Sequence, residues 1–397
     1  MTGGALVRRQ LAMLGAVCAL GSSSALAQEP SGPQAVSPAQ LTAAINKLGD
    51  LDYDTRTAAS RTVRRTPPAQ AVPALLAAVS ENADGYVRYR ALVLLTGFND
   101  PRTKDAMRES ITSPNDRLRT VAYSFFEHNP DKAMLPELLR ALVKEQAEFV
   151  RPALVRALAA HGSDPAVQKT LVGEVGRGED FFRSAVIEAL GDYKAGYAYD
   201  ALTAVAKLDG PLQDDAAIAL GKIGDKRALE TLSALQSTAP RPRQPSLATG
   251  ICLLDVNCAS HEGYLVETLK FTDQNPGYQE LLRGAANGLG ALAINGHESA
   301  AQALLTIGIP SRDPTRAPVA LALGATALRN TALTLKILET HADRAKAIAL
   351  IGEGFDMLEE DLDKERFFAL VRRTYWASKQ GSPTQELMQT LIGNLDF

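Results

Sequence analysis

One motif recurs along this chain at intervals of roughly 28 to 38 residues, and this recurrence constrains the fold more than any other feature. Its clearest copy is segment 181–192, in which Val186, Ala189 and Leu190 share one face of a helix that ends near Gly191. Ten copies predict a solenoid, because each unit buries its apolar side only against its neighbours. The reference position of the motif is held by Arg56, Arg88, Arg119, Arg151, Arg183, Gln213, Gln244, Leu282, Arg316 and Arg344.

Each unit is expected to contain two helices. An apolar helix, such as those expected over 71–79 and 133–143, precedes the helix that carries the reference position, and short polar connections separate the two. No segment alternates apolar and polar residues for long enough to predict a strand. The sequence therefore predicts an all-α fold, namely a right-handed α-solenoid of about ten helix pairs over 38–355 with C-terminal capping helices over 356–397.

The N-terminus has the features of a secretory signal peptide. Arg8 and Arg9 precede an apolar run over 11–20, and Ala25-Leu26-Ala27 fits an A-x-A cleavage site. The run is shorter than the roughly 20 apolar residues that span a bilayer. We expect a signal peptide over 1–27 with cleavage after Ala27, a flexible leader over 28–37, and a periplasmic or secreted protein without a transmembrane segment. A retained signal anchor is the alternative.

The charge balance gives no sign of a nucleic-acid partner. The chain has 42 basic and 45 acidic residues and a net charge of −3, without the basic stripe that nucleic-acid binding needs. One acidic run extends from Glu353 to Glu365 but lacks the residue order of a calcium loop. We expect this run to be a solvated face of the capping helices, and attraction of a basic partner is the alternative.

The motif resembles that of a known repeat family. Helices that end in Ala-Leu-Gly, as at 189–191 and 219–221, and the Val-Pro-x-Leu-Leu pattern at 72–76 resemble HEAT repeats of the short kind found in phycobilin lyases. The resemblance covers roughly 41–355 and implies architecture rather than activity, because repeat frameworks host unrelated sites. It also implies bilin attachment, which an exported protein would not perform on cytoplasmic phycobiliproteins.

Two His-Glu pairs are candidate metal ligands. His261-Glu262 and His297-Glu298 invite comparison with deoxyhypusine hydroxylase, a HEAT-like di-iron enzyme, but that resemblance implies four pairs at the starts of second helices. Here two pairs fall on first helices, where Glu suits the positive end of the helix dipole. Because the chain also lacks a G-x-S-x-G elbow, a phosphate loop and a C-x-x-C pair, we predict no metal, no cofactor and no catalytic residue.

Two cysteines, Cys252 and Cys258, remain after signal cleavage. In an oxidising compartment they can form a disulfide if the chain leaves helical geometry near 255–257. Two separate buried thiols are the alternative.

The reference arginines are expected to be structural. Asp100, Asp131, Asp164 and Asp225 follow reference positions by 12 or 13 residues, so that each arginine can meet an acid of its own or the preceding unit. A row of arginines that binds a partner is the alternative.

Aromatic residues stand two positions before several reference positions, as Tyr86, Phe149 and Phe181, with Arg117 in the intervening unit. Equivalent positions of adjacent units lie about 10 Å apart, so these four side chains are expected to form one ridge. Aromatic residues and Arg often anchor interfaces, and ordinary inter-repeat core is the alternative. The ridge hypothesis requires Tyr86, Phe149 and Phe181 to be at least partly exposed.

These features predict an exported, non-catalytic scaffold that binds a partner protein or peptide on the ridge. The alternative is an enzyme, or an accessory factor of one, with a site in the irregular region 244–282. A concave pocket with converging polar groups in that region would favour the alternative.

Overall fold

The computed structural model describes residues 36–358, 360–395 and 397. The predicted signal peptide, including Cys18, and most of the predicted leader lie outside these residues. Within them the chain forms helices throughout and no strand, which confirms the predicted all-α solenoid.

The first twenty helices form ten consecutive pairs. The first helices of the pairs are α1 (Pro38–Asn46), α3 (Pro68–Glu81), α5 (Arg102–Ser110), α7 (Leu135–Lys144), α9 (Pro165–Glu174), α11 (Tyr199–Ala206), α13 (Ala228–Thr238), α15 (Cys258–Gln274), α17 (Glu298–Gly308) and α19 (Thr331–Thr340). The second helices are α2 (Tyr53–Arg65), α4 (Gly85–Thr96), α6 (Asp116–His128), α8 (Arg151–Ala159), α10 (Asp180–Asp192), α12 (Gln213–Ile223), α14 (Gln244–Leu253), α16 (Gln279–Ile294), α18 (Arg316–Arg329) and α20 (Arg344–Met357). Two further helices follow, α21 (Asp361–Ala377) and α22 (Pro383–Leu395).

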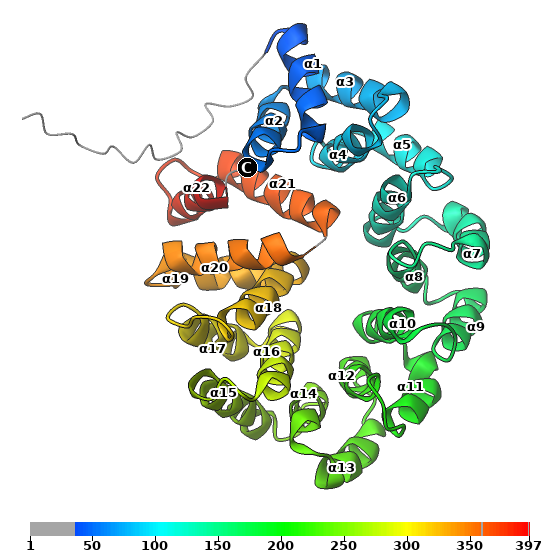
Figure 1. The fold of residues 1–397 in the computed structure, drawn as a ribbon, viewed down its shortest axis with the longest axis vertical. Helices are drawn as coiled ribbons and strands as arrows, with labels where there is room; N and C mark the ends of the chain where they lie inside the picture. Colours follow the sequence, from blue (N-terminus) through cyan, green and yellow to red (C-terminus); the bar gives the residue numbers. More distant parts are fainter. Residues whose placement is uncertain (1–35, 359, 396) are drawn as a thin grey trace, which may run out of the picture.

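The pairs curve into a ring, with the second helices on the inside and the first helices on the outside (Figure 1). From α4 onward, each second helix packs on the second helix of the next unit. The glycines that end the motif permit this close approach: a Cβ on Gly221 would lie 2.5 Å from the carbonyl oxygen of Gly250, and a Cβ on Gly324 would lie 3.0 Å from Cα of Gly354. The Ala-Leu-Gly ending is therefore a packing requirement.

Most of the reference side chains bind backbone carbonyls near the end of the preceding first helix, whereas Arg151 pairs with Glu174 and Leu282 has no polar group. Arg88 Nε donates to the carbonyl of Val79 at 2.7 Å, and Gln213 Nε2 donates to that of Ala206 at 2.8 Å. Such carbonyls lack partners within their own helix. Arginine and glutamine can therefore replace each other at this position, because both supply an N–H group that donates to a free carbonyl at the end of the first helix.

The structural role of the reference arginines holds, but the aspartate partners expected for them are wrong. Asp100 pairs with Arg102 and Asp225 pairs with Arg227, each two residues further on. Asp164 caps the start of α9 by accepting from the backbone N–H of Ala166. These aspartates act within their own turns because a short Asp side chain reaches the next backbone N–H groups more easily than a neighbouring unit.

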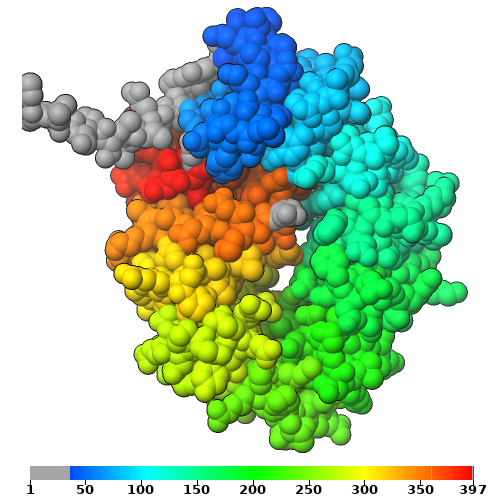
Figure 2. Space-filling model, viewed as in Figure 1, coloured from blue at the N-terminus to red at the C-terminus, as the bar shows by residue number. Residues whose placement is uncertain are grey.

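Helix α21 closes the ring. It packs against α4 and α6 as well as α18, whereas α22 packs on α19, α20 and α21 (Figure 1). Leu362 near the start of α21 belongs to the hydrophobic core of the N-terminal units, while Phe367 and Val371 belong to the core of the C-terminal units. In Figure 2 the C-terminal segments lie directly against the N-terminal ones. The boundary predicted at residue 355 stays a prediction, but α21 does more than cap the last unit.

Candidate functional site

Acidic side chains of α21 enter the inner face of the N-terminal units. Arg64 Nη2 of α2 lies 2.7 Å from Glu365 Oε2, and the Glu365 side chain is only 1% exposed. Arg90 Nη1 of α4 lies 3.0 Å from Asp361 Oδ2, which also accepts a hydrogen bond from the Tyr89 hydroxyl. These contacts, here called the clasp, join the two ends of the solenoid.

A third carboxylate extends the clasp to α6, where His128 Nε2 lies 2.7 Å from Asp363 Oδ1. Burial alone would raise the pKa of Asp361 and of Asp363, but Arg90 and Lys364 beside Asp361, and His128 beside Asp363, lower both pKa values to about 2. The solvated acidic face expected over 353–365 is therefore wrong for these carboxylates, because ring closure brings cations of distant units to them.

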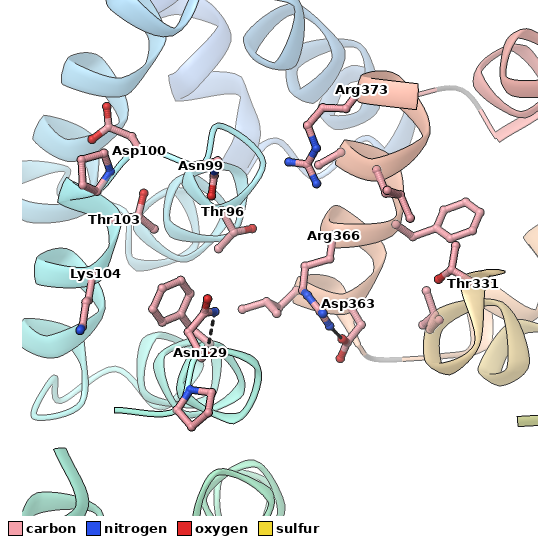
Figure 3. A pocket seen from close by; sticks show the side chains of 18 residues that line it. Thr96, Asn99, Asp100, Thr103, Lys104, Asn129, Thr331, Asp363, Arg366 and Arg373 are labelled. Atoms are coloured by element: carbon pink, nitrogen blue, oxygen red, sulfur yellow. Dashed lines mark hydrogen bonds and ion pairs between the residues drawn. The ribbon is translucent and has the colours of Figure 1, made fainter. Parts of the chain in front are cut away.

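A cavity of about 790 Å³ lies between α21 and the connections around α5 and α6. Figure 3 shows Arg366 and Arg373 of α21 facing Thr96, Asn99 and Asn129 across this cavity. Arg366 is held by Asp363 at 2.8 Å, whereas no ion pair joins Arg373 to an acid within the described ranges. The cavity thus offers a guanidinium, hydroxyl and amide groups that can bind an anionic group such as a carboxylate, and the carboxylates of Asp100 and Asp363 also line it.

A second group of charges joins opposite sides of the ring. Asp192 at the end of α10 lies 2.9 Å from Arg156 Nη1, 2.6 Å from Lys222 Nζ and 3.5 Å from Arg329 Nη1, which belongs to α18 across the ring. Burial alone would raise the pKa of Asp192, but Lys222 and Arg156 lower it to about 2. By contrast, burial raises the pKa of nearby Asp215 to about 6.

The four ridge residues lie at the starts of successive second helices, along one rim of the ring. Asp84 and Asn115 cap α4 and α6 by accepting from the backbone N–H groups of Tyr86 and Arg117, which fixes these two residues at their helix starts. Phe149 lies in the turn two residues before α8 and is largely exposed.

The ridge has an apolar part and a cationic part. Phe149 and Phe181 are 80% and 57% exposed, and their ring centroids lie 6.2 Å apart. Arg117, also exposed, holds its guanidinium carbon 5.5 Å from the ring centroids of both Tyr86 and Tyr89. Tyr86 is half-buried. The exposure that the ridge hypothesis requires is therefore present, while partner binding itself stays a prediction.

The irregular region 244–282 brings several reactive groups together. Cys252 and Cys258 are joined by a disulfide across the connection 254–257, which leaves helical geometry as the pairing requires. His297 Nδ1 lies 3.7 Å from Cys258 Sγ and 3.7 Å from Glu262 Oε2. A pocket of about 640 Å³ opens beside these side chains. This pocket is open and mainly apolar, and Glu262 and His297 are the polar side chains that meet beside Cys258 in it.

The His-Glu pairs do not assemble as a di-iron site. Glu262 of one pair meets His297 of the other, while the one metal-sized group among the described residues consists of Cys252, Cys258 and His297. In the disulfide form these two sulfurs are not thiolates, which are the form that ligates metals.

Sequence reasoning missed the clasp. Its partners lie roughly 235 to 301 residues apart in the chain, and the carboxylates of the pairs lie outside the repeated motif. One signal was available in α4, where Arg90 sits among apolar residues and a cation needs an acid that the local sequence does not supply.

Comparison with known proteins supports the repeat architecture. The family profile for HEAT repeats matches residues 41–125, and the profile for the PBS lyase HEAT-like repeat matches residues 212–238. No curated protein matches the chain.

Solved structures resemble the chain only distantly. The X-ray structure of YibA of Escherichia coli is 17% identical, with 55% of this chain and 82% of that one covered at a TM-score of 0.41. An engineered protein is 18% identical, with 90% and 98% covered at 0.28. The complex of CpcE and CpcF of phycocyanin lyase from Nostoc is 18% identical, with 83% and 97% covered at 0.25. Similarities at these scores carry nothing about function.

None of the described helices is both long enough and apolar enough to cross a membrane.

Proposed function

We propose that this protein is an exported, non-catalytic scaffold that binds a partner protein or peptide on the ridge of Tyr86, Arg117, Phe149 and Phe181. One observation supports the proposal above the others: Phe149 and Phe181, on adjacent units, pair at 6.2 Å and yet stay 80% and 57% exposed. Contiguous exposed apolar surface is a common feature of interaction sites.

Covering the two exposed phenylalanine rings with a partner is energetically more favourable than leaving them in water. Fully burying a large apolar side chain contributes about 1.5 to 3 kcal/mol, so covering the exposed parts of the phenylalanine pair contributes about 2 to 4 kcal/mol, up to half of a micromolar affinity. Phe181 lies on α10 and Phe149 lies in the short turn before α8, and both segments belong to a packed solenoid, so little ordering cost accompanies binding. Because anchor residues dominate binding energy, two such rings are sufficient to define a docking point.

The cationic part of the ridge determines which chemical group of a partner binds beside the apolar part. Arg117 stacks on Tyr86 and Tyr89, and no acid of the described ranges forms an ion pair with its guanidinium. Stacking holds the planar group in place while its N–H donors stay available to a carboxylate. The preferred partner is therefore a segment that presents apolar side chains next to an acidic residue.

Export is the second part of the proposal. Arg8-Arg9, the apolar run over 11–20 and Ala25-Leu26-Ala27 support processing by signal peptidase. A disulfide between Cys252 and Cys258 suits an oxidising compartment. The intact mass of the protein purified from an extracytoplasmic fraction tests this part, since cleavage after Ala27 predicts a chain that begins at Gln28.

A matched pair of variants tests the ridge. Phe149→Ala with Phe181→Ala removes its apolar part, while Phe271→Ala with Tyr278→Ala removes another exposed aromatic pair, whose rings lie 5.1 Å apart elsewhere on the ring. We expect the partner recovered with the unaltered protein from its native fraction to be lost with the first variant and retained with the second. Equal recovery with both variants would show that the ridge is not the binding site.

A further inference from the structure

The connection between α14 and α15 places one cysteine inside the protein and the other at its surface. Cys252, near the end of α14, is 1% exposed, whereas Cys258 is the first residue of α15 and is partly exposed. Asp255 and Asn257 between them adopt left-handed φ angles of 60° and 46°. This turn brings the two sulfurs together while leaving only Cys258 accessible.

Three features of Cys258 favour a reactive thiolate when the bond is open. Cys258 begins a helix of 17 residues, whose N-terminal N–H groups and dipole stabilise a negative charge. His297 Nδ1 lies 3.7 Å from its sulfur, so that a protonated imidazole can pair with a thiolate. Glu262 Oε2, 3.7 Å from the same nitrogen, adds a negative charge that attracts the imidazolium beside the sulfur. Cys252 has the opposite surroundings, since it is buried near the negative end of α14.

The adjoining pocket gives a substrate access to Cys258. Its volume is about 640 Å³, and small residues, Ala259, Gly263 and Ser299, form part of its wall beside Cys258 and His297. Small side chains let the backbone of another chain approach the sulfur.

We propose that Cys252 and Cys258 form a thiol–disulfide exchange centre whose substrates are the thiols and disulfides of other proteins, with Cys258 as the exchanging sulfur. This activity goes beyond the scaffold role and does not depend on the ridge.

The exchange balances without a further reagent. A substrate thiolate attacks Cys258 Sγ, the bond to Cys252 breaks, and the electron pair leaves on Cys252 Sγ, which takes up a proton from water. A second thiolate of the substrate then attacks the substrate sulfur of the mixed disulfide and releases the Cys258 thiolate. The substrate gains one disulfide and this protein holds two thiols. In the reverse direction the Cys258 thiolate attacks a substrate disulfide, and Cys252 resolves the mixed disulfide.

Single-cysteine variants test this assignment, with Cys18→Ser in every variant so that no third thiol interferes. Oxidised glutathione is the probe, and intact mass reports the mixed disulfide. We expect Cys252→Ala, which keeps Cys258, to react at least about tenfold faster than Cys258→Ala, because exposure and thiolate character control thiol reactivity. His297→Gln in the Cys252→Ala background is expected to slow the reaction several-fold, whereas His341→Gln, a histidine remote from Cys258, leaves the rate unchanged.

Other results of these measurements would contradict the proposal. Equal rates for the two single-cysteine variants, or a rate insensitive to His297→Gln, would reduce the disulfide to a structural bond. If Cys252→Ala does not fold, the Cys18→Ser protein is reduced in its native buffer and the alkylation of each cysteine is mapped by peptide mass. Faster labelling of Cys258 than of Cys252 supports the proposal, and loss of the fold on reduction overturns it.

Discussion

Arg64 and Glu365 are 301 positions apart in the chain, yet Arg64 Nη2 lies 2.7 Å from Glu365 Oε2 and both side chains are buried. Arg372 lies near the same carboxylate, and its hydrogen bond to the Arg64 carbonyl ties α21 to α2. Burial lowers the pKa of Arg372 to about 10 although Glu365 acts in the opposite direction. Glu365 is therefore the negative charge that lets two arginines stay inside the closed ring.

Neutralising Glu365 should weaken ring closure. Glu365→Gln keeps the shape of the side chain but leaves Arg64 without its counter-charge, and breaking a buried pair in this way costs about 3 to 5 kcal/mol. We expect a lower melting temperature and a larger radius of gyration by small-angle scattering. Glu386→Gln, at an exposed position of α22, is the control and should change neither quantity. An unchanged radius with a normal melting temperature for Glu365→Gln would mean that the ring does not depend on this pair.

The contact between Asp192 and Arg329 should contribute energy across the ring. A double-mutant cycle with Asp192→Asn and Arg329→Gln is expected to give a coupling energy of about 1 kcal/mol in chemical unfolding, since partly buried charges in one network couple more strongly than exposed pairs. The exposed pair Asp105 and Arg108, three residues apart on α5, should give less than about 0.5 kcal/mol. Equal coupling for both pairs would remove the cross-ring role of Asp192.

Acid should loosen the clasp. Asp361 and Asp363 have folded pKa values of about 2, below the value of about 3.9 in an unfolded chain. The unfolded chain therefore takes up protons first as the pH falls, so the stability that these groups provide is complete above pH 4 and is lost between about pH 4 and pH 2. Melting temperatures across this window should fall less steeply for Asp361→Asn than for the unaltered protein. Parallel curves would contradict the lowered pKa of Asp361.

The contribution of Asp215 to stability should depend on pH in the opposite direction. Burial raises its folded pKa to about 6, so the folded state holds the proton more tightly and stability falls as the pH rises from about 4 to 6. Asp215→Asn keeps a hydrogen-bonding group next to Ser184 and removes the buried charge. We expect this variant to be more stable at pH 7.5, by at most about 3 kcal/mol, and nearly unchanged at pH 4. A stability gain that is the same at both pH values would point to a cause other than ionisation.

The sequence was sufficient to predict the local architecture. The spacing of the motif predicted ten helix pairs, and its glycines mark the close contacts between second helices, as between Gly221 and Gly250. Periodicity reports which face of a helix is buried, and it does so within each unit.

Ring closure could not be predicted in the same way. The curvature of the ring is the sum of small rotations between successive units, and the sequence of a single unit does not specify that sum. The partners of Arg64, Arg90 and His128 on α21 became visible only when the two ends met. The reference arginines show a related limit: the aspartates that sequence spacing suggested act within their own turns, while the arginines bind backbone carbonyls or other acids, such as Glu145 and Glu174.

Site-specific photo-crosslinking from the ridge tests the scaffold proposal most directly. A photoreactive phenylalanine analogue is placed at Phe149 or at Phe181, and for comparison at Phe271, and the proteins are irradiated in the cell fraction that contains the unaltered protein. We predict that the first two positions crosslink the same partner, through one segment rich in apolar and acidic residues, and that the Phe271 position does not. The same partners from all three positions, or none from Phe149 and Phe181, would contradict partner binding on the ridge.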